Sequence, residues 1–170
     1  MAKFLTVDPS TGFHKEVSTV TTSAGAGDVG KIAGLDATGK LDMSVMPVGL
    51  GAETDIITAS EALAAGDYVN IWDSTGAKVR KADATVVGKE AHGFVLAAVA
   101  SAASATVYRP SQSNTQRTGM TPGIRQYLST TPGASTPTPP AASGNVVQFL
   151  GVAVSATALD FIPGQPTILA

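Results

Sequence analysis

The sequence contains no cysteine among its 170 residues. This absence excludes disulfide bonds, thiolate catalysis and zinc sites with sulfur ligands. Histidine is also scarce, with only His14 and His92, and neither belongs to a metal-binding spacing such as His-x-x-x-His. The sequence therefore predicts no metal site, and we expect stability to come from packing and oligomerisation.

Charged residues make up only 14% of the chain, against about 25% in a typical soluble domain. Few charges leave little repulsion between copies in solution, which favours a surface covered in an assembly. A neutral exterior rich in Ser and Thr is the alternative interpretation. The net charge is −2, and the only local basic group is Lys78, Arg80 and Lys81, which is typical of a solvated strand edge. Without a basic face, we expect no nucleic-acid partner.

Long hydrophobic runs are missing as well. The longest apolar stretch, residues 94–108, is diluted with Ser and Ala and is too short to span a bilayer. Near the start, Asp8 and Pro9 interrupt the chain before an apolar signal core could form. We therefore expect synthesis in the cytoplasm and no membrane partner.

No arrangement of residues composes an active site. Residues 25–30 match G-x-G-x-x-G, but Gly34 and Gly39 follow at once and argue against the helix that a dinucleotide site requires. No G-x-S-x-G motif supplies a serine nucleophile. A small glycan hydrolase would need a catalytic carboxylate, and the acidic residues mostly sit in turn-like contexts beside Gly or Thr: Asp28, Asp36, Asp42, Glu53 and Asp55. The sequence predicts no catalytic residue and no cofactor, so we expect a protein that is not an enzyme.

Two regions of the sequence differ in glycine content and in strand pattern. Residues 1–52 are punctuated by glycine and hold short extended pieces such as 15–22, which predicts an extended arm. Residues 53–170 carry short alternating segments separated by Gly and Pro turns, which is typical of a sandwich or barrel. The strands expected there are 68–72, 77–80, 92–99, 105–109, 124–129, 145–154 and 158–162. The predicted fold is all-β, a compact β-sandwich or β-barrel domain with a Gly-rich N-terminal arm.

Three segments lack a strand pattern. Thr58 and Glu61 have capping-box spacing, which allows a helix of two turns at most, with a loop as the alternative. Residues 111–122 are polar, and residues 130–144 hold four of the ten prolines. Proline cannot donate to a β ladder, so the second segment is expected to be a surface loop. Either loop could contact a neighbour or simply face solvent.

The segment Gly30–Pro47 resembles a phrase, GKI-x-x-LDA-x-GKLD-x-S-x-MP, that recurs in bacteriophage virion proteins, near the N-terminal part of fibres and head-decorating proteins. Later segments are similar to the same group, among them residues 64–71, 81–85, 90–95, 128–133, 144–148 and 151–155. Residues 123–127 depart from it, because the group more often has a Gly-Ala-x-Tyr-Tyr type of strand there. The resemblance implies a capsid decoration (cement) or head fibre protein and carries no catalytic residues.

The expected function is therefore structural. The chain would bind the major capsid protein on the outer capsid surface of the virion, as a homo-oligomer with a trimer favoured over a dimer, and would stabilise or decorate the head. A tail or fibre component, either adaptor or receptor-binding protein, is the alternative. Several apolar residues of the arm need a surface to bury against, either the chain's own β domain or other subunits: Ile32, Leu35, Leu41, Val45, Met46, Val48 and Leu50. The predicted interface contacts are Phe4, Leu5, Phe13, Met43, Met46, Pro47 and Leu50.

Overall fold

The computed structural model describes residues 3–46 and 52–170. The chain divides into two compact units, Met1–Gly51 and Ala52–Ala170. This division lies one residue from the boundary that the change in sequence texture indicates. The N-terminal unit contains the strands β1 (Lys3–Val7) and β2 (His14–Ser18) and two single-turn 3-10 helices, η1 (Ala26–Asp28) and η2 (Met43–Val45).

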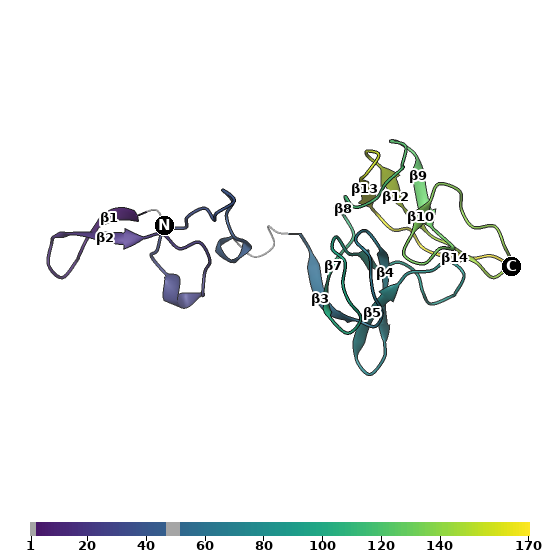
Figure 1. Cartoon of the computed structure of the whole chain (residues 1–170), viewed down its shortest axis with the longest axis horizontal. Coiled ribbons are helices and arrows are strands. Elements are labelled where there is room, and N and C mark those ends of the chain that lie inside the picture. The colour runs from purple at the N-terminus through teal and green to yellow at the C-terminus, as the bar shows by residue number, and fades with distance from the viewer. Residues whose placement is uncertain (1–2, 47–51) are drawn as a thin grey trace. The chain divides into compact units, whose positions relative to one another are not determined.

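The first half of the C-terminal unit is a closed barrel of five strands (Figure 1). Around the barrel the order is β3-β5-β4-β6-β7. Most neighbours run antiparallel, while β3 and β5 run parallel. The strands are β3 (Thr54–Ala59), β4 (Tyr68–Asp73), β5 (Ala77–Lys81), β6 (Gly93–Phe94) and β7 (Ser104–Tyr108). Closure removes the unpaired edges that an open sheet would expose.

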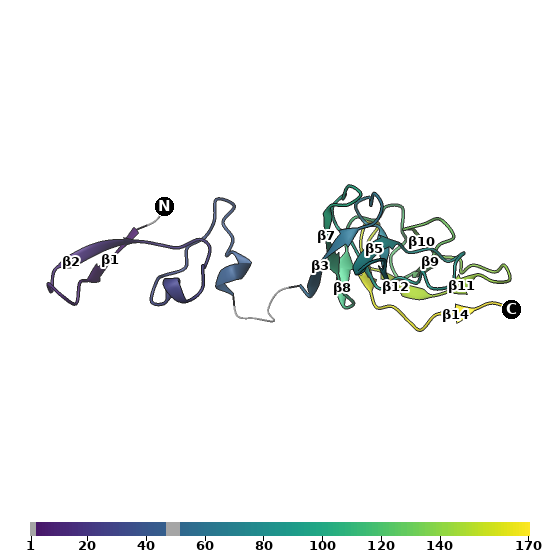
Figure 2. The same cartoon turned by 90° about the horizontal axis from the view of Figure 1, so that it is seen from below.

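The second half of the unit is an antiparallel sheet with the order β10-β9-β12-β13-β8. A separate two-stranded ladder, β11 with β14, lies at the C-terminal end of the chain (Figure 2). These strands are β8 (Gln112–Asn114), β9 (Arg125–Leu128), β10 (Ser135–Thr136), β11 (Val146–Val147), β12 (Phe149–Ala153), β13 (Leu159–Phe161) and β14 (Thr167–Ile168). The described residues form no α-helix, so the all-β prediction is confirmed. No helix in this part of the chain is long and apolar enough to cross a membrane.

The β4–β5 hairpin follows the sequence pattern closely. Val69 pairs with Lys81 and Asp73 with Ala77 across the ladder. In the turn, the Asp73 carboxylate accepts a hydrogen bond from the Gly76 amide at 3.0 Å, and Gly76 has a φ of 104°. Glycine tolerates this conformation because it has no Cβ. Local turn chemistry and strand alternation therefore agree at this hairpin.

Residues 54–61 do not form the short helix that the spacing of Thr58 and Glu61 allows. Thr58 lies in β3, where it pairs with Ser104 of β7 and Lys78 of β5, so the short helix is wrong. The Glu61 carboxylate accepts a hydrogen bond from the Lys81 backbone amide at 2.8 Å instead of capping a helix. Pairing with two strands distant in sequence outweighs a weak local signal here.

Other segments are shorter or more ordered than the pattern indicates. The expected strand 92–99 is reduced to β6, in which Phe94 pairs with Tyr108. The polar loop 111–122 contributes the edge strand β8, and the proline-rich segment 130–144 contributes the edge strand β10. Edge strands need only one neighbour, so short polar segments suffice to form them.

Two apolar clusters hold this unit together. One fills the barrel and includes Val69, Val79, Val95 and Val107. The other joins barrel residues to the second sheet through Tyr68, Phe94 and Phe161 together with Leu128, Leu150 and Leu159. The Phe161 ring lies 5.6 Å from that of Tyr68 and 5.7 Å from that of Phe94, measured between centroids. Barrel and sheet therefore share one core.

Gly151 marks the tightest point of the sheet. It lies at a register shift between β12 and β9, has a φ of 151°, and an added Cβ would come within 1.8 Å of the Asp160 carbonyl oxygen. We predict that Gly151→Ala lowers the free energy of unfolding by about 2–5 kcal/mol, through backbone strain and steric overlap. Urea unfolding of the full chain measures this loss. Gly164→Ala is the matched control, because its Cβ would meet only ordinary contacts at 3.4 Å. Equal midpoints for the two variants would contradict the prediction.

Candidate interaction surface

The N-terminal unit begins with a hairpin of two short strands. Phe4 pairs with Val17 and both are half-buried, while Leu5 pairs with Glu16 and is 70% exposed. Phe13 follows the turn and is 75% exposed. The turn is closed by the Asp8 amide, which donates to the Phe13 carbonyl at 2.9 Å. A two-stranded hairpin is at best marginally stable alone in water, so these apolar side chains favour a further surface.

A second turn spans residues 36–40 and is organised by one carboxylate. Asp36 Oδ1 accepts hydrogen bonds from the Thr38 amide at 2.8 Å, the Thr38 hydroxyl at 2.7 Å and the Lys40 amide at 3.0 Å. Gly39 has a φ of 78°, which suits a residue without a Cβ. These bonds hold the pKa of Asp36 below its ordinary value, with the Lys40 amide contributing most.

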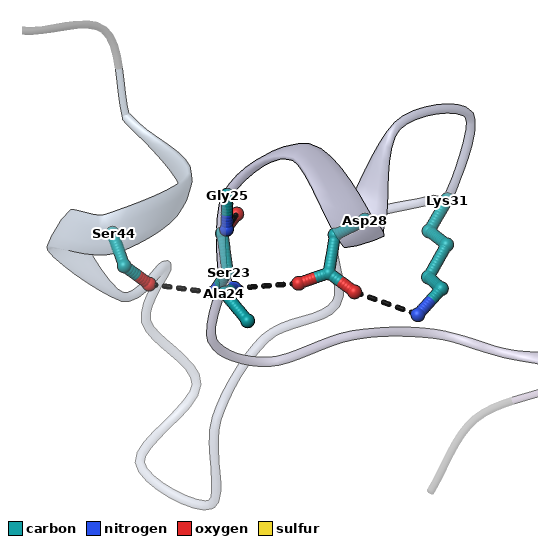
Figure 3. Close-up of polar contacts among 6 residues, drawn as sticks. All are labelled: Ser23, Ala24, Gly25, Asp28, Lys31 and Ser44. Carbon is teal, nitrogen blue, oxygen red and sulfur yellow. Dashed lines mark hydrogen bonds and ion pairs between the residues drawn. The ribbon is translucent and has the colours of Figure 1, made fainter.

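Asp42 and Asp28 organise the remaining turns in the same way. Asp42 Oδ1 accepts from the Ser44 amide at 2.9 Å at the start of η2, and Ser44 interactions lower the Asp42 pKa. As Figure 3 shows, the Asp28 carboxylate accepts hydrogen bonds from Lys31 Nζ, at 2.6 Å, and from the Ala24 amide, at 2.5 Å. The Lys31 bond is the main cause of a lowered Asp28 pKa. All three carboxylates therefore act on local turns, as the sequence analysis expects.

The G-x-G-x-x-G segment adopts a geometry unlike a dinucleotide site. Residues 26–28 form only the single turn η1, where a nucleotide-binding fingerprint requires a sustained helix. The loop is instead tied to η2, because the Ser23 amide donates to Ser44 Oγ at 2.7 Å (Figure 3). Ser23, just before the motif, thus joins this loop to η2.

The apolar residues of the same segments are left uncovered. None of residues 3–42 and 44–46 is buried. Large apolar side chains that are 46% to 84% exposed lie between the turns: Val29, Ile32, Leu35 and Leu41. Carboxylates and glycines thus order the turns, and the apolar side chains are left without cover within this unit.

The predicted contacts form two groups. Phe4, Leu5 and Phe13 lie together on the β1–β2 hairpin. Met43 begins η2, and the half-buried Met46 follows it and lines a shallow pocket with Asp28 and Lys31. Figures 1 and 2 show the hairpin and η2 at opposite ends of this unit. Pro47 and Leu50, like Val48, lie outside the described residues.

Four exposed residues are missing from the predicted contacts. Ile32, Leu35 and Leu41 are recognisable in the sequence as apolar residues that need cover, but Val29 is not singled out by any pattern. The sequence does hold a signal that could have identified these four residues. Each of them lies next to or between the Asp, Gly and Ser residues that form the turns. An apolar residue held between two local turns cannot easily fold inward.

No ligand-holding cluster appears in the described part of the chain. It contains no group of three or more His, Asp or Glu side chains that could hold a metal ion. His92 is exposed, and its Nδ1 accepts a hydrogen bond from the Ile71 amide at 3.1 Å. No protein-family model, curated protein or solved structure matches this chain.

The turn of Asp36 should respond to acid. Because the folded-state pKa lies below the ordinary 3.8, the ionised carboxylate stabilises the turn fully above pH 3.8, and this contribution is lost as the pH falls through the lower folded value. We predict that the Thr38 and Lys40 amide chemical shifts stay constant from pH 6 to 5 and move below about pH 4. Two-dimensional NMR of the full chain measures them.

Asp36→Asn is the control for this titration. The amide oxygen of Asn still accepts the same hydrogen bonds but carries no titrating charge. The variant should therefore keep the turn and lose the acid response. Unchanged wild-type shifts down to pH 2 would show that the carboxylate does not hold the turn.

Proposed function

We propose that this chain is a bacteriophage structural protein that binds the outer capsid surface through its N-terminal unit and stabilises or decorates the head. One observation carries the proposal: none of residues 3–42 and 44–46 is buried, although they include large apolar side chains. The resemblance of residues 30–47 to a phrase of phage virion proteins supports the same role. So does the low share of charged residues in the chain.

The energetics of such an attachment are favourable. Burying a large aliphatic side chain contributes about 1.5–3 kcal/mol relative to leaving it exposed. Val29, Ile32, Leu35 and Leu41 would together offset much of the cost of association, and the cost of ordering is smaller for a segment whose turns are already formed. A ligand that binds only the assembled shell stabilises that shell by mass action. The bound protein would thus resist loss of capsid subunits.

The C-terminal unit suits a solvent-facing role. One row across its second sheet joins Ser113, Asp160, Val152 and Arg125. Ser113, Val152 and Arg125 are exposed, and Ser113 Oγ contacts the Asp160 carboxylate. This row of three polar residues and one valine is compatible with display on the particle surface.

The proposal includes a small homo-oligomer, a trimer in preference to a dimer. A free two-stranded hairpin offers unpaired edges that another copy could extend. Light scattering coupled to size exclusion gives the subunit number of the full chain directly. A chain that stays monomeric at all concentrations, with ordered residues 3–46, would contradict this part of the proposal.

The same resemblance is shared with fibre proteins, so a tail or fibre position is the competing function. A map of the phage particle by cryo-electron microscopy separates the two. Density on the head, in many copies, is the expected result. Density on the tail alone would replace the capsid proposal with the fibre one.

The attachment role predicts a specific loss. Leu35→Ser should weaken binding to particles that lack the protein by about tenfold or more, because a side chain contributing at least about 1.4 kcal/mol is removed from the interface. Co-sedimentation with such particles measures the affinity. The matched control is Ile162→Ser in the C-terminal unit, since Leu35 and Ile162 are 60% and 61% exposed.

Both variants should unfold at the wild-type temperature, because neither residue is buried. Equal binding by Leu35→Ser and wild type would remove Leu35 from the proposed interface. Equal losses for both variants would show that exposed apolar residues act nonspecifically.

A further inference from the structure

A small polar pocket lies in the C-terminal unit, beside the start of β9. Its volume is about 140 Å³, and the side chains that matter here are Arg117, Thr118, Gln126 and Ser135. Arg117 and Thr118 come from the loop that follows β8, Gln126 from β9 and Ser135 from β10. Three neighbouring segments between residues 117 and 137 therefore build this pocket, and it belongs neither to the N-terminal unit nor to the proposed capsid attachment.

Arg117 is held in place but lacks a counter-charge. Its Nη1 donates to the Gly66 carbonyl at 3.0 Å, and Asn114 Nδ2 donates to the same oxygen at 2.9 Å. The guanidinium carbon lies 5.5 Å from the centre of the Tyr68 ring. Within residues 3–46 and 52–170, no carboxylate lies within 4.0 Å of this guanidinium, and its buried Nε meets no acceptor.

Two more polar groups lie at this place. Gln126 lines the pocket and is only 3% exposed as a residue, and no hydrogen bond joins its side-chain amide to another described residue; that amide is open to the pocket, because only Tyr68 Oη and Arg117 Nε are both buried and unpartnered among the described side chains. The Tyr68 hydroxyl is buried and also unpartnered. Burial raises the pKa of Tyr68 to about 12, against smaller opposing effects from Arg117, Asn114 and Ser135. The phenol therefore keeps its proton at neutral pH and remains a donor.

Unpartnered buried donors are costly. Each costs about 1–3 kcal/mol, and a cation removed from water needs an anion or good acceptors. The contrast with other buried amides in this unit is direct, because Gln148 bonds both the amide and the carbonyl of Ala91, at 2.7 and 3.0 Å. The pocket beside β9 is thus the exception in a well-satisfied core.

We propose that this pocket binds a carboxylate group, with Arg117 as its charge partner and Gln126 as a second donor. A guanidinium offers parallel N–H groups that match the two oxygens of a carboxylate. The lining side chains include a cation and no acid, which disfavours a cationic ligand. The volume equals roughly four or five water molecules at about 30 Å³ each, enough for a short acidic group and too small for a nucleotide.

The carboxylate has two candidate sources with the same chemistry. One is a free small acid, and the other is an Asp or Glu side chain of another polypeptide. The first test uses the full chain at pH 7 and constant ionic strength, with sodium acetate replacing sodium chloride. NMR follows the Arg117 Nε–H and the Gln126 side-chain amide. We expect saturable shifts of both signals at millimolar acetate.

A second arm uses a short peptide with blocked termini and a single Glu. Tighter binding of this peptide than of acetate would assign the site to an acidic side chain, and the reverse order would assign it to a free acid. Sodium phosphate is the specificity control. Saturation by phosphate at the same concentration as acetate would overturn the carboxylate assignment, because a general anion site would explain it.

Variants complete the test. Arg117→Lys should weaken acetate binding at least tenfold, because lysine cannot offer the paired N–H groups, while the exposed Arg125→Lys should leave it unchanged. Gln126→Met keeps the volume and removes the amide, so it tests the site even where the Arg117 variant unfolds. It should weaken binding several-fold. Absence of a saturable shift with both acetate and peptide, or equal losses for Arg117→Lys and Arg125→Lys, would overturn the proposal without touching the capsid function.

Discussion

The packing of Phe161 against Tyr68 and Phe94 is the contact on which the C-terminal unit depends. Tyr68 and Phe94 belong to barrel strands and Phe161 to the second sheet, so these rings convert two small β structures into one core. Each half is small, and small domains bury too little surface to be more than marginally stable alone. Gln148 adds a polar fastening, since it bonds both backbone groups of Ala91 from the other half. The unit therefore has a buried core that spans both of its halves.

The N-terminal unit solves the same problem differently. Its backbone is ordered by Asp28, Asp36 and Asp42, each of which accepts hydrogen bonds from residues no more than four positions away. Such bonds define turns but bury almost nothing, so the apolar side chains between them stay exposed. A segment with formed turns loses less conformational entropy on binding than a disordered one. The unit is thus preorganised for a surface that lies outside the unit itself, which is the physical basis of the proposed attachment.

The sequence predicts features that depend on near neighbours and misses those that depend on distant ones. The β4–β5 hairpin is predictable because Asp73 and Gly76 close the turn and the strands alternate. Strand β3 is not, because Thr58 pairs with Ser104 and Lys78, which no local pattern reveals. The turn roles of Asp36 and Asp42 are readable from their Gly and Thr neighbours. The exposure of Val29 is not, because exposure depends on the absence of a partner. The pocket beside β9 is not predictable either, because its side chains come from a loop and two strands within residues 117–137 and no motif marks them.

The two proposed binding elements rest on different physics, and this difference bears on how they would work together. An apolar surface such as that of Val29 and Leu35 supplies affinity but little orientation, because the hydrophobic effect is not directional. The half-buried Arg117 supplies orientation. Its Nε–H has no acceptor, and a carboxylate can accept hydrogen bonds from a guanidinium only in a narrow range of geometries. A protein that decorates a regular lattice needs both properties. If the carboxylate belongs to a neighbouring subunit, the N-terminal unit would set how tightly the protein is held and Arg117 would set how the C-terminal unit is turned. If it belongs to a free acid, the two elements act independently, and the attachment argument stands on the apolar side chains alone.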